Sequence, residues 1–458
     1  EKATRGMSIY AKIAYAFLTS MAIIVPFAAG SQYYPILQTV SQFNLFKVSA
    51  IFILSGCSFF FFALDVFLGE HKIRWNSIMW PALTYLVFTV LSFAFSLDKR
   101  LSVLGDYDRY AGLIPTIFTV LIMFLALQLI RSNNGMKFFM MLFVGASILL
   151  AGYGIAQSFG IETARFANAN IMGRRSFSLY GKPNLYAGYL CFAVFFSGGL
   201  LFSESNKKWR VFYWVALIMN LGVSLTSMTR SIWLALVIVI PLFVLLLVRQ
   251  RATLASNDKI MLGAGSVLGI GSILFTFTKK NVDLNVASRL TSIFSSEGSS
   301  GTRIEMWKSA LSIIKEYPLF GAGPDTFGIT GMTHLTDRYL SLVGLGEVPN
   351  NAHSLPLQLA ATIGITGMLA YYFVFIYAVV VSWKYAWDNN AQEQSGSKIL
   401  YGTVLCAIVA FMVHSLVSIA DVGVQPFYWI GLAYLVVPRS RSIDLEGQLT
   451  PALLLIVA

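Results

Sequence analysis

Long apolar segments recur along the chain and are separated by short polar connections. Most are about 17 to 25 residues long, the length that an α-helix needs to cross a hydrocarbon layer roughly 30 Å thick. We therefore expect an all-α integral membrane protein, a single multi-span domain over residues 1–458 with about twelve transmembrane helices. The predicted spans are 8–29, 48–68, 77–95, 113–130, 138–159, 184–202, 211–226, 232–248, 260–278, 367–383, 399–418 and 425–438.

The composition agrees with this interpretation. Of the 458 residues, 57% are hydrophobic and 12% are charged, a balance that no soluble domain of this size needs to fill its core. The first apolar segment is long enough to remain as a span, so we expect no cleavable signal peptide. The formal charge of +12 partly reflects cytoplasmic anchors, and we expect no nucleic-acid partner. The final apolar stretch, 445–458, is too short to span a membrane and has no interpretation.

The short connections predict the orientation of the chain. Lysine and arginine gather on one side, and by the positive-inside rule that side, with both termini, is cytoplasmic. The residues that carry this bias are Lys2, Arg5, Lys72, Arg74, Arg131, Lys137, Lys207, Lys208, Arg210, Arg249, Arg251, Lys259, Lys384, Lys398, Arg439 and Arg441.

Two long segments, 160–183 and 279–352, fall on the opposite, extracytoplasmic face, where loops of a rigid scaffold usually carry function. In the second segment, Thr302 and Glu305 have the spacing of a capping box. Apolar residues then recur at helical spacing until Pro318, which predicts an amphipathic rim helix over 302–316.

The apolar pattern restarts at His353. Gly364 and Gly367 separate a short apolar piece from the span that follows. This spacing predicts a re-entrant or rim helix with His353 in its first turn, a position tolerated at that depth only if the ring faces protein or a wet cavity.

Six basic residues lie on the extracytoplasmic face, against the charge bias: Arg165, Arg174, Arg175, Lys182, Arg230 and Arg303. Arg230 is in a very short connection between two spans, where a charge is costly unless it is paired or hydrated. Because the guanidinium presents a fixed fork of donors that fits phosphate oxygens, the pattern favours an anionic lipid head group such as a diphosphate. The alternative is that Arg230 snorkels or pairs with Glu162 or Asp421.

Asp106 and Asp108 form a D-x-D, the short motif that holds a metal and a sugar phosphate in many glycosyltransferases. Lys99, Arg100 and Arg109 partly neutralise it, and a clear third oxygen ligand is missing. We therefore favour ordinary loop charges or an Asp–Arg pair. The sequence contains neither H-E-x-x-H nor G-x-S-x-G, and we expect no metal and no cofactor.

His353 stands in Pro349-Asn350-Asn351-Ala352-His353-Ser354. A neutral imidazole at the rim, with Asn350, Asn351 and Ser354 available to fix its tautomer, is suited to act as a general base. The alternative is a histidine that caps its own helix.

Four motifs, in this order around the spans, resemble the bacterial O-antigen ligase and O-antigen polymerase superfamily. They are RSFSLYGKPNLYAGYL at 175–190, TRSIW at 229–233, Arg303-x-x-x-Trp307 leading to PLFGAG at 318–323, and NAHS at 351–354. The resemblance implies a GT-C-like fold in the bacterial cytoplasmic membrane. It also implies transfer of a glycan from undecaprenyl diphosphate to a hydroxyl acceptor, such as a lipid A-core sugar, at the extracytoplasmic face without a metal.

By the same resemblance, Arg175 and Arg230, with Arg174 beside them, hold the diphosphate and His353 activates the acceptor hydroxyl. Positioning of donor or acceptor is expected from Lys182, Asn184, Arg303, Asn351 and Ser354. Lys182 departs from the family, which often has asparagine there.

The alternatives within the superfamily are a polysaccharide polymerase and a protein O-oligosaccharyltransferase. They differ in their acceptor, whose surface we expect in the segment 324–348. A lipid or glycan transporter would require ionisable residues at mid-membrane and paired broken helices in two repeated halves. The charged residues gather instead at the predicted outer rim.

Overall fold

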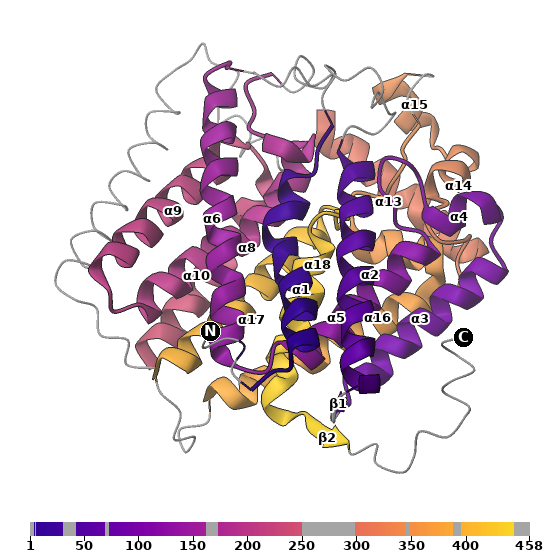
Figure 1. Cartoon of the computed structure of the whole chain (residues 1–458). Helices are drawn as coiled ribbons and strands as arrows, with labels where there is room; N and C mark the ends of the chain where they lie inside the picture. Colours follow the sequence, from indigo (N-terminus) through magenta and orange to yellow (C-terminus); the bar gives the residue numbers. More distant parts are fainter. Residues whose placement is uncertain are drawn as a thin grey trace.

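The computed structural model describes residues 4, 6–30, 43–68, 73–161, 173–249, 298–344, 348–387 and 395–443. These residues form a bundle of long apolar helices (Figure 1). The α-helices are α1 (Ile9–Phe27), α2 (Asn44–Leu68), α3 (Met79–Ala94), α4 (Lys99–Leu104), α5 (Leu113–Leu129), α6 (Asn133–Ser158), α8 (Pro183–Ser203), α9 (Lys207–Thr226), α10 (Arg230–Arg249), α13 (Gly298–Glu316), α14 (Phe327–Thr333), α15 (Asp337–Val343), α16 (Leu355–Trp387), α17 (Ser395–Leu416) and α18 (Gln425–Val436). Short 3₁₀ turns are η2 (Ser178–Tyr180) and η3 (Val437–Arg439).

The predicted all-α membrane fold is confirmed. Within the described ranges, eight helices are long and apolar enough to cross a membrane, and α3 and α5 are shorter apolar helices. Eleven of the twelve predicted spans coincide with helices, while the span predicted at 260–278 lies outside the described residues. The part 162–172 of the segment 160–183, which includes Arg165, also lies outside them, as do the parts 279–297 and 345–347 of the long loop and the stretch 445–458.

A small β-ribbon is an addition that the hydrophobic pattern did not predict. Strands β1 (Ile73–Trp75) and β2 (Arg441–Ile443) pair antiparallel, with Ile73 opposite Ile443. The side chain of Gln128 bonds both the N–H and the carbonyl of Arg74. The ribbon therefore joins α2, α5 and the end of α18 at one end of the bundle (Figure 1).

Helix α8 forms the centre of the bundle. In its apolar window 94% of the residues are buried, compared with 33% in α2 and in α9. Close packing against α17 depends on Gly199, because a Cβ there would lie 2.1 Å from Thr403 Oγ1. The rings of Phe143, Tyr189 and Phe427 pack around the same centre, with ring centroids 4.5 to 6.0 Å apart. The bundle thus has a rigid interior against which the connecting segments are placed.

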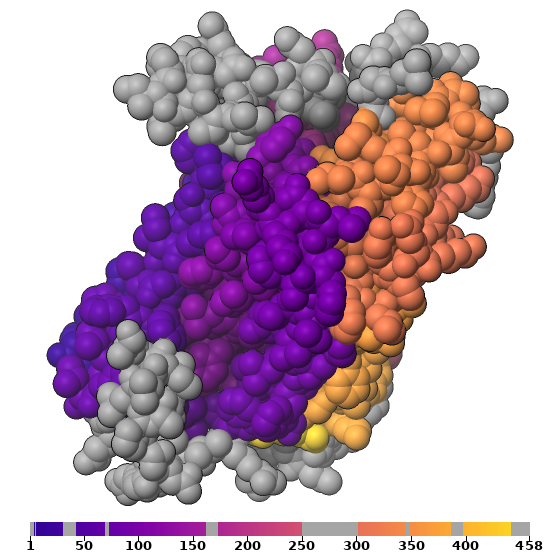
Figure 2. Space-filling model, turned by 90° about the vertical axis from the view of Figure 1, so that its right-hand side faces the viewer, coloured from indigo at the N-terminus to yellow at the C-terminus, as the bar shows by residue number. Residues whose placement is uncertain are grey.

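Helices α4, α13, α14 and α15 lie together at the end of the bundle opposite the β-ribbon, which we call the loop end (Figure 1). Figure 2 shows the face on which the chain segment 298–387, in orange, meets the purple helices that precede residue 130.

The capping box predicted at Thr302 is wrong. Helix α13 includes Gly298, so Thr302 lies inside the helix and not at its start. The carboxylate of Glu305 instead accepts hydrogen bonds from Thr336 Oγ1 at 2.8 Å and Lys308 Nζ at 2.8 Å. Because Glu305 ties α13 to the start of α15, the T-x-x-E spacing reflects a tertiary contact.

The break predicted at Gly364 is present. Gly364 has φ 81° and ψ 167° and separates the rim turn 355–363 from the long apolar part of α16. The backbone N–H of Ile365 donates to Pro318 O at 2.9 Å, and Thr366 Oγ1 donates to Leu319 O. The turn 318–323 therefore fills the break and holds the rim turn in place. His353 was predicted in the first turn of this helix, but it lies two residues before the helix begins at Leu355.

Candidate functional site

A cavity of about 200 Å³ lies at the loop end and is lined by segments that are far apart in the sequence. Four of the residues predicted for the site, Lys182, Asn184, Asn351 and His353, line it. The rest of the lining is Asn44, Asp108, Arg109, Leu185, Asn350, Ile419, Ala420 and Asp421.

His353 has a left-handed backbone, with φ 46°, immediately before α16. Its backbone N–H donates to Asn351 Oδ1 at 2.8 Å, and Asn351 Nδ2 donates to Asn350 Oδ1 at 2.6 Å. The two amides therefore shape the turn, whereas we had expected them to orient the imidazole. The ring Nδ1 is buried and has no hydrogen-bond partner. A non-glycine residue in this conformation carries strain on the order of 1–3 kcal/mol, a feature that often marks functional sites.

Burial lowers the pKa of His353 to about 3, and the positive charges of Arg303, Lys182 and Arg109 act in the same direction. The imidazole is therefore neutral at physiological pH and able to accept a proton. An anion bound among these cations would offset their field and raise the pKa of the ring.

The D-x-D turn contributes to the same cavity through Asp108. Lys182 Nζ lies 2.7 Å from Asp108 Oδ2, and Asn350 Nδ2 lies 3.4 Å from the same oxygen. Asp106 Oδ1 accepts a hydrogen bond from the backbone N–H of Asp108. Across the described parts of the chain, His, Cys, Asp and Glu form no group of three or more that could hold a metal ion. Asp108 here serves as an ion-pair partner of Lys182.

Arg175 connects two of the predicted motifs. Its Nε donates to Ser227 O at 3.1 Å and its Nη2 to Met228 O at 3.3 Å. These carbonyls belong to the connection that leads into Arg230, the half-buried first residue of α10. Arg174 is exposed. The structure thus brings the two arginine-bearing segments together, although none of the three arginines lines the 200 Å³ cavity.

Arg303 and Ser354 do not line the cavity, but both contact segments that form its wall. Arg303 Nη1 donates to Val417 O at 3.3 Å, which attaches α13 to the connection that carries Ile419, Ala420 and Asp421. Ser354 is buried, and its carbonyl accepts a hydrogen bond from Gln358 N at 2.8 Å.

Sequence reasoning did not assign Lys47 to the site and considered Asp421 only as a partner of Arg230. Lys47 is fully buried, and its Nζ donates to Ala28 O at 2.9 Å and Leu179 O at 2.7 Å. Burial raises the pKa of Asp421 to about 6, while the charge of Lys47 opposes this shift. A lone lysine near the start of an apolar segment was the signal that could have identified this position.

Comparison with known proteins gives one family. No curated protein matches the chain. Residues 214–372, about a third of the chain, match the protein-family model described as O-antigen ligase. The matched region contains Arg230, Arg303 and His353. Together with the apolar helices, this match supports assignment of the chain to the O-antigen ligase and O-antigen polymerase superfamily, as an integral membrane enzyme of the transferase class.

Proposed function

We propose that the chain transfers a glycan from undecaprenyl diphosphate to a hydroxyl acceptor at the extracytoplasmic face of the bacterial inner membrane. The observation that carries this proposal is a neutral His353, with its Nδ1 buried, in a cavity lined by the cations Lys182 and Arg109 and influenced by Arg303. A neutral imidazole beside cations suits a reaction that removes a proton from a hydroxyl and releases an anion.

In the proposed step, the acceptor oxygen attacks the anomeric carbon of the donor glycan and its proton passes to His353. The bond between the anomeric carbon and the phosphate oxygen breaks, and its electron pair stays on the departing lipid diphosphate. Arg175 and Arg230, with Arg174 near them, are proposed to stabilise that charge. The contact of Arg175 with Ser227 and Met228 supports a joint role of the first two.

Donor binding would also activate the base. The field of Arg303, Lys182 and Arg109 disfavours protonation of His353. A diphosphate would neutralise much of that field and raise the pKa of the ring. Burial is the larger cause of the low pKa and would persist, so we infer that donor binding makes His353 a stronger base by removing the smaller, electrostatic part of the shift.

Metal independence belongs to the same proposal. Cations from side chains would stabilise the leaving group in the way that a divalent metal does in other transferases. The pairing of Asp108 with Lys182 supports a structural role for the D-x-D turn.

The test uses the full chain, purified in liposomes with an undecaprenyl-diphosphate-linked glycan and EDTA. Lipid A-core, free glycan and an acceptor protein are supplied in separate reactions. We expect transfer by the wild type to one of them, and loss of transfer in His353→Ala and in Arg230→Ala at wild-type membrane yield. If His353→Ala keeps near-full turnover, His353 is not the base. If the wild type loses activity in EDTA, the metal-binding interpretation of Asp106 and Asp108 is restored.

A further inference from the structure

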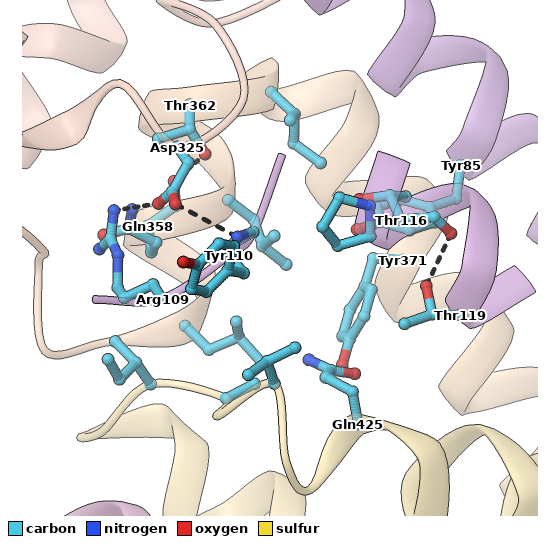
Figure 3. Close-up of a pocket in the computed structure, with 18 of the residues that line it drawn as sticks. Tyr85, Arg109, Tyr110, Thr116, Thr119, Asp325, Gln358, Thr362, Tyr371 and Gln425 are labelled. Carbon is cyan, nitrogen blue, oxygen red and sulfur yellow. Dashed lines mark hydrogen bonds and ion pairs between the residues drawn. The ribbon is translucent and has the colours of Figure 1, made fainter. Parts of the chain in front are cut away.

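A second cavity, of about 90 Å³, shares part of its lining with the first one. Figure 3 shows the residues that line this second cavity. It is enclosed by α3, α5, α16, α18 and the segment that follows α4. Arg109, Ile419 and Ala420 line both cavities. The two cavities therefore meet at a shared wall, and His353 lies on the side of the first cavity.

Arg109 has hydrogen-bonding capacity that the protein leaves unused. Its side chain is only 9% exposed, and Nη2 bonds Asp325 Oδ1. Its Nε and Nη1 are buried and have no hydrogen-bond partner. A buried guanidinium donor without an acceptor costs free energy, so its retention at a cavity wall points to a ligand oxygen.

Asp325 fixes the orientation of this arginine. Its Oδ2 accepts hydrogen bonds from the backbone N–H groups of Asp106 at 2.7 Å and Ala111 at 3.2 Å. The carboxylate is fully buried, and Figure 3 shows it beside the guanidinium. The two free donors of Arg109 are thus held in one position before any ligand arrives.

The rest of the lining has the chemistry of a sugar subsite. Tyr85, Tyr371 and Trp429 supply aromatic surface, which packs against the C–H face of a sugar ring. Thr116 and Gln425 add hydroxyl and amide groups of the kind that bond sugar hydroxyls, and Figure 3 shows Gln425 beside Tyr371. A purely apolar ligand such as a prenyl chain would leave the donors of Arg109 unpaired.

We propose that this second cavity binds the sugar of the acceptor, with Arg109 donating hydrogen bonds to its oxygens. The proposal rests on the proposed function. An incoming hydroxyl attacks from the side opposite the leaving group. Because Arg175 and Arg230 would hold that group on the side of α8 and α10, the acceptor belongs on the side of α5 and α16. The subsite would therefore place an acceptor hydroxyl next to His353.

The test measures transfer kinetics with the acceptor that the wild type uses. Donor and acceptor concentrations are varied separately, so that each has its own KM. Arg109→Lys keeps a cation beside Asp325 and removes the planar fork. We expect it to raise the acceptor KM roughly tenfold or more, the effect of a lost charged hydrogen bond, with donor KM and kcat little changed. Tyr371→Phe removes one hydroxyl and should raise the acceptor KM severalfold, which keeps the test usable if Arg109→Lys fails to fold. Arg210→Lys, at the start of α9, is the matched control.

Unchanged acceptor KM in both variants, or a rise in donor KM alone, would overturn the subsite while leaving the transferase function intact. A glycan product attached to protein would also overturn it, because the acceptor would then carry no sugar. Calorimetric binding of lipid-free core oligosaccharide separates the two proposals. If the wild type binds it and Arg109→Lys binds it at least tenfold more weakly in the absence of transfer, the subsite stands and the proposed function falls. If the wild type neither transfers nor binds it, the subsite falls as well.

Discussion

Replacement of Gly364 by alanine tests whether the break in α16 positions the rim turn that follows His353. Gly364 has φ 81° and ψ 167°, a region open essentially only to glycine. A Cβ there would lie 1.9 Å from Leu319 O and 2.7 Å from Phe320 N, and both are backbone atoms that cannot rotate away.

The backbone conformation alone costs about 1–3 kcal/mol for a residue with a Cβ. Relief of the overlap requires the turn 318–323 to move away from the break. That movement would strain the hydrogen bonds Ala322 N to Ala361 O at 3.0 Å and Gly323 N to Thr362 O at 2.9 Å. We therefore expect Gly364→Ala to destabilise the protein by roughly 3 kcal/mol or more.

The assay combines thermal unfolding in detergent with the transfer rate in liposomes. Gly152→Ala, inside α6, is the matched control, because the nearest atom to its Cβ would be Met219 Cε at 3.7 Å, an ordinary contact, and alanine favours a helix. We expect Gly364→Ala to lower both the unfolding temperature and the transfer rate, and Gly152→Ala to change them little. Equal unfolding temperatures and rates in the two variants would refute the claim that the break holds the site together.

Three further predictions concern charged groups around the first cavity. The folded-state pKa of His353, about 3, lies below its ordinary value of 6.5, so between these values the unfolded chain binds more protons. Acidification from pH 7 to 5 should therefore lower the unfolding temperature of the wild type more than that of His353→Gln. An equal change of unfolding temperature with pH in the two proteins would contradict this. Lys182→Asn breaks a half-exposed ion pair with Asp108, so the free energy of unfolding should change by only about 0–1 kcal/mol. The KM for the donor should rise if Lys182 contacts phosphate. Lys47→Met removes a buried cation from the neighbourhood of Asp421. It should lower the free energy of unfolding, measured by thermal denaturation, by roughly 3 kcal/mol. Adding Asp421→Asn should recover part of that loss, and a purely additive double variant would show that the two charges do not interact.

Hydropathy was sufficient for the membrane fold because the bilayer sets the length of each span and the requirement acts on every segment separately. The same local logic found the break at Gly364, since glycine is visible in the chain itself, and it placed His353 within two residues of the start of α16. It also singled out Arg175 and Arg230 as basic residues outside the predicted cytoplasmic connections.

Predictions from local sequence were wrong where a side chain could bond either a neighbour in the chain or a distant segment. Thr302 and Glu305 have the spacing of a helix cap, yet Glu305 bonds Thr336 on another helix. Asn351 was expected to orient the imidazole, but its Oδ1 accepts the backbone N–H of His353. The same residues allow either contact, and tertiary packing determines which of the two forms.

By itself, then, the sequence determined the spans that the structure describes, the rim break, the resemblance to the family whose model matches residues 214–372, and the residue types that the proposed chemistry requires. Only the tertiary structure decided which of these residues share a cavity. Arg109 and Asp325 are 216 positions apart, and a fixed guanidinium with two free donors exists only where their segments meet in a buried place. Burial and long-range pairing depend on the three-dimensional packing of many segments, so no short stretch of the chain encodes them.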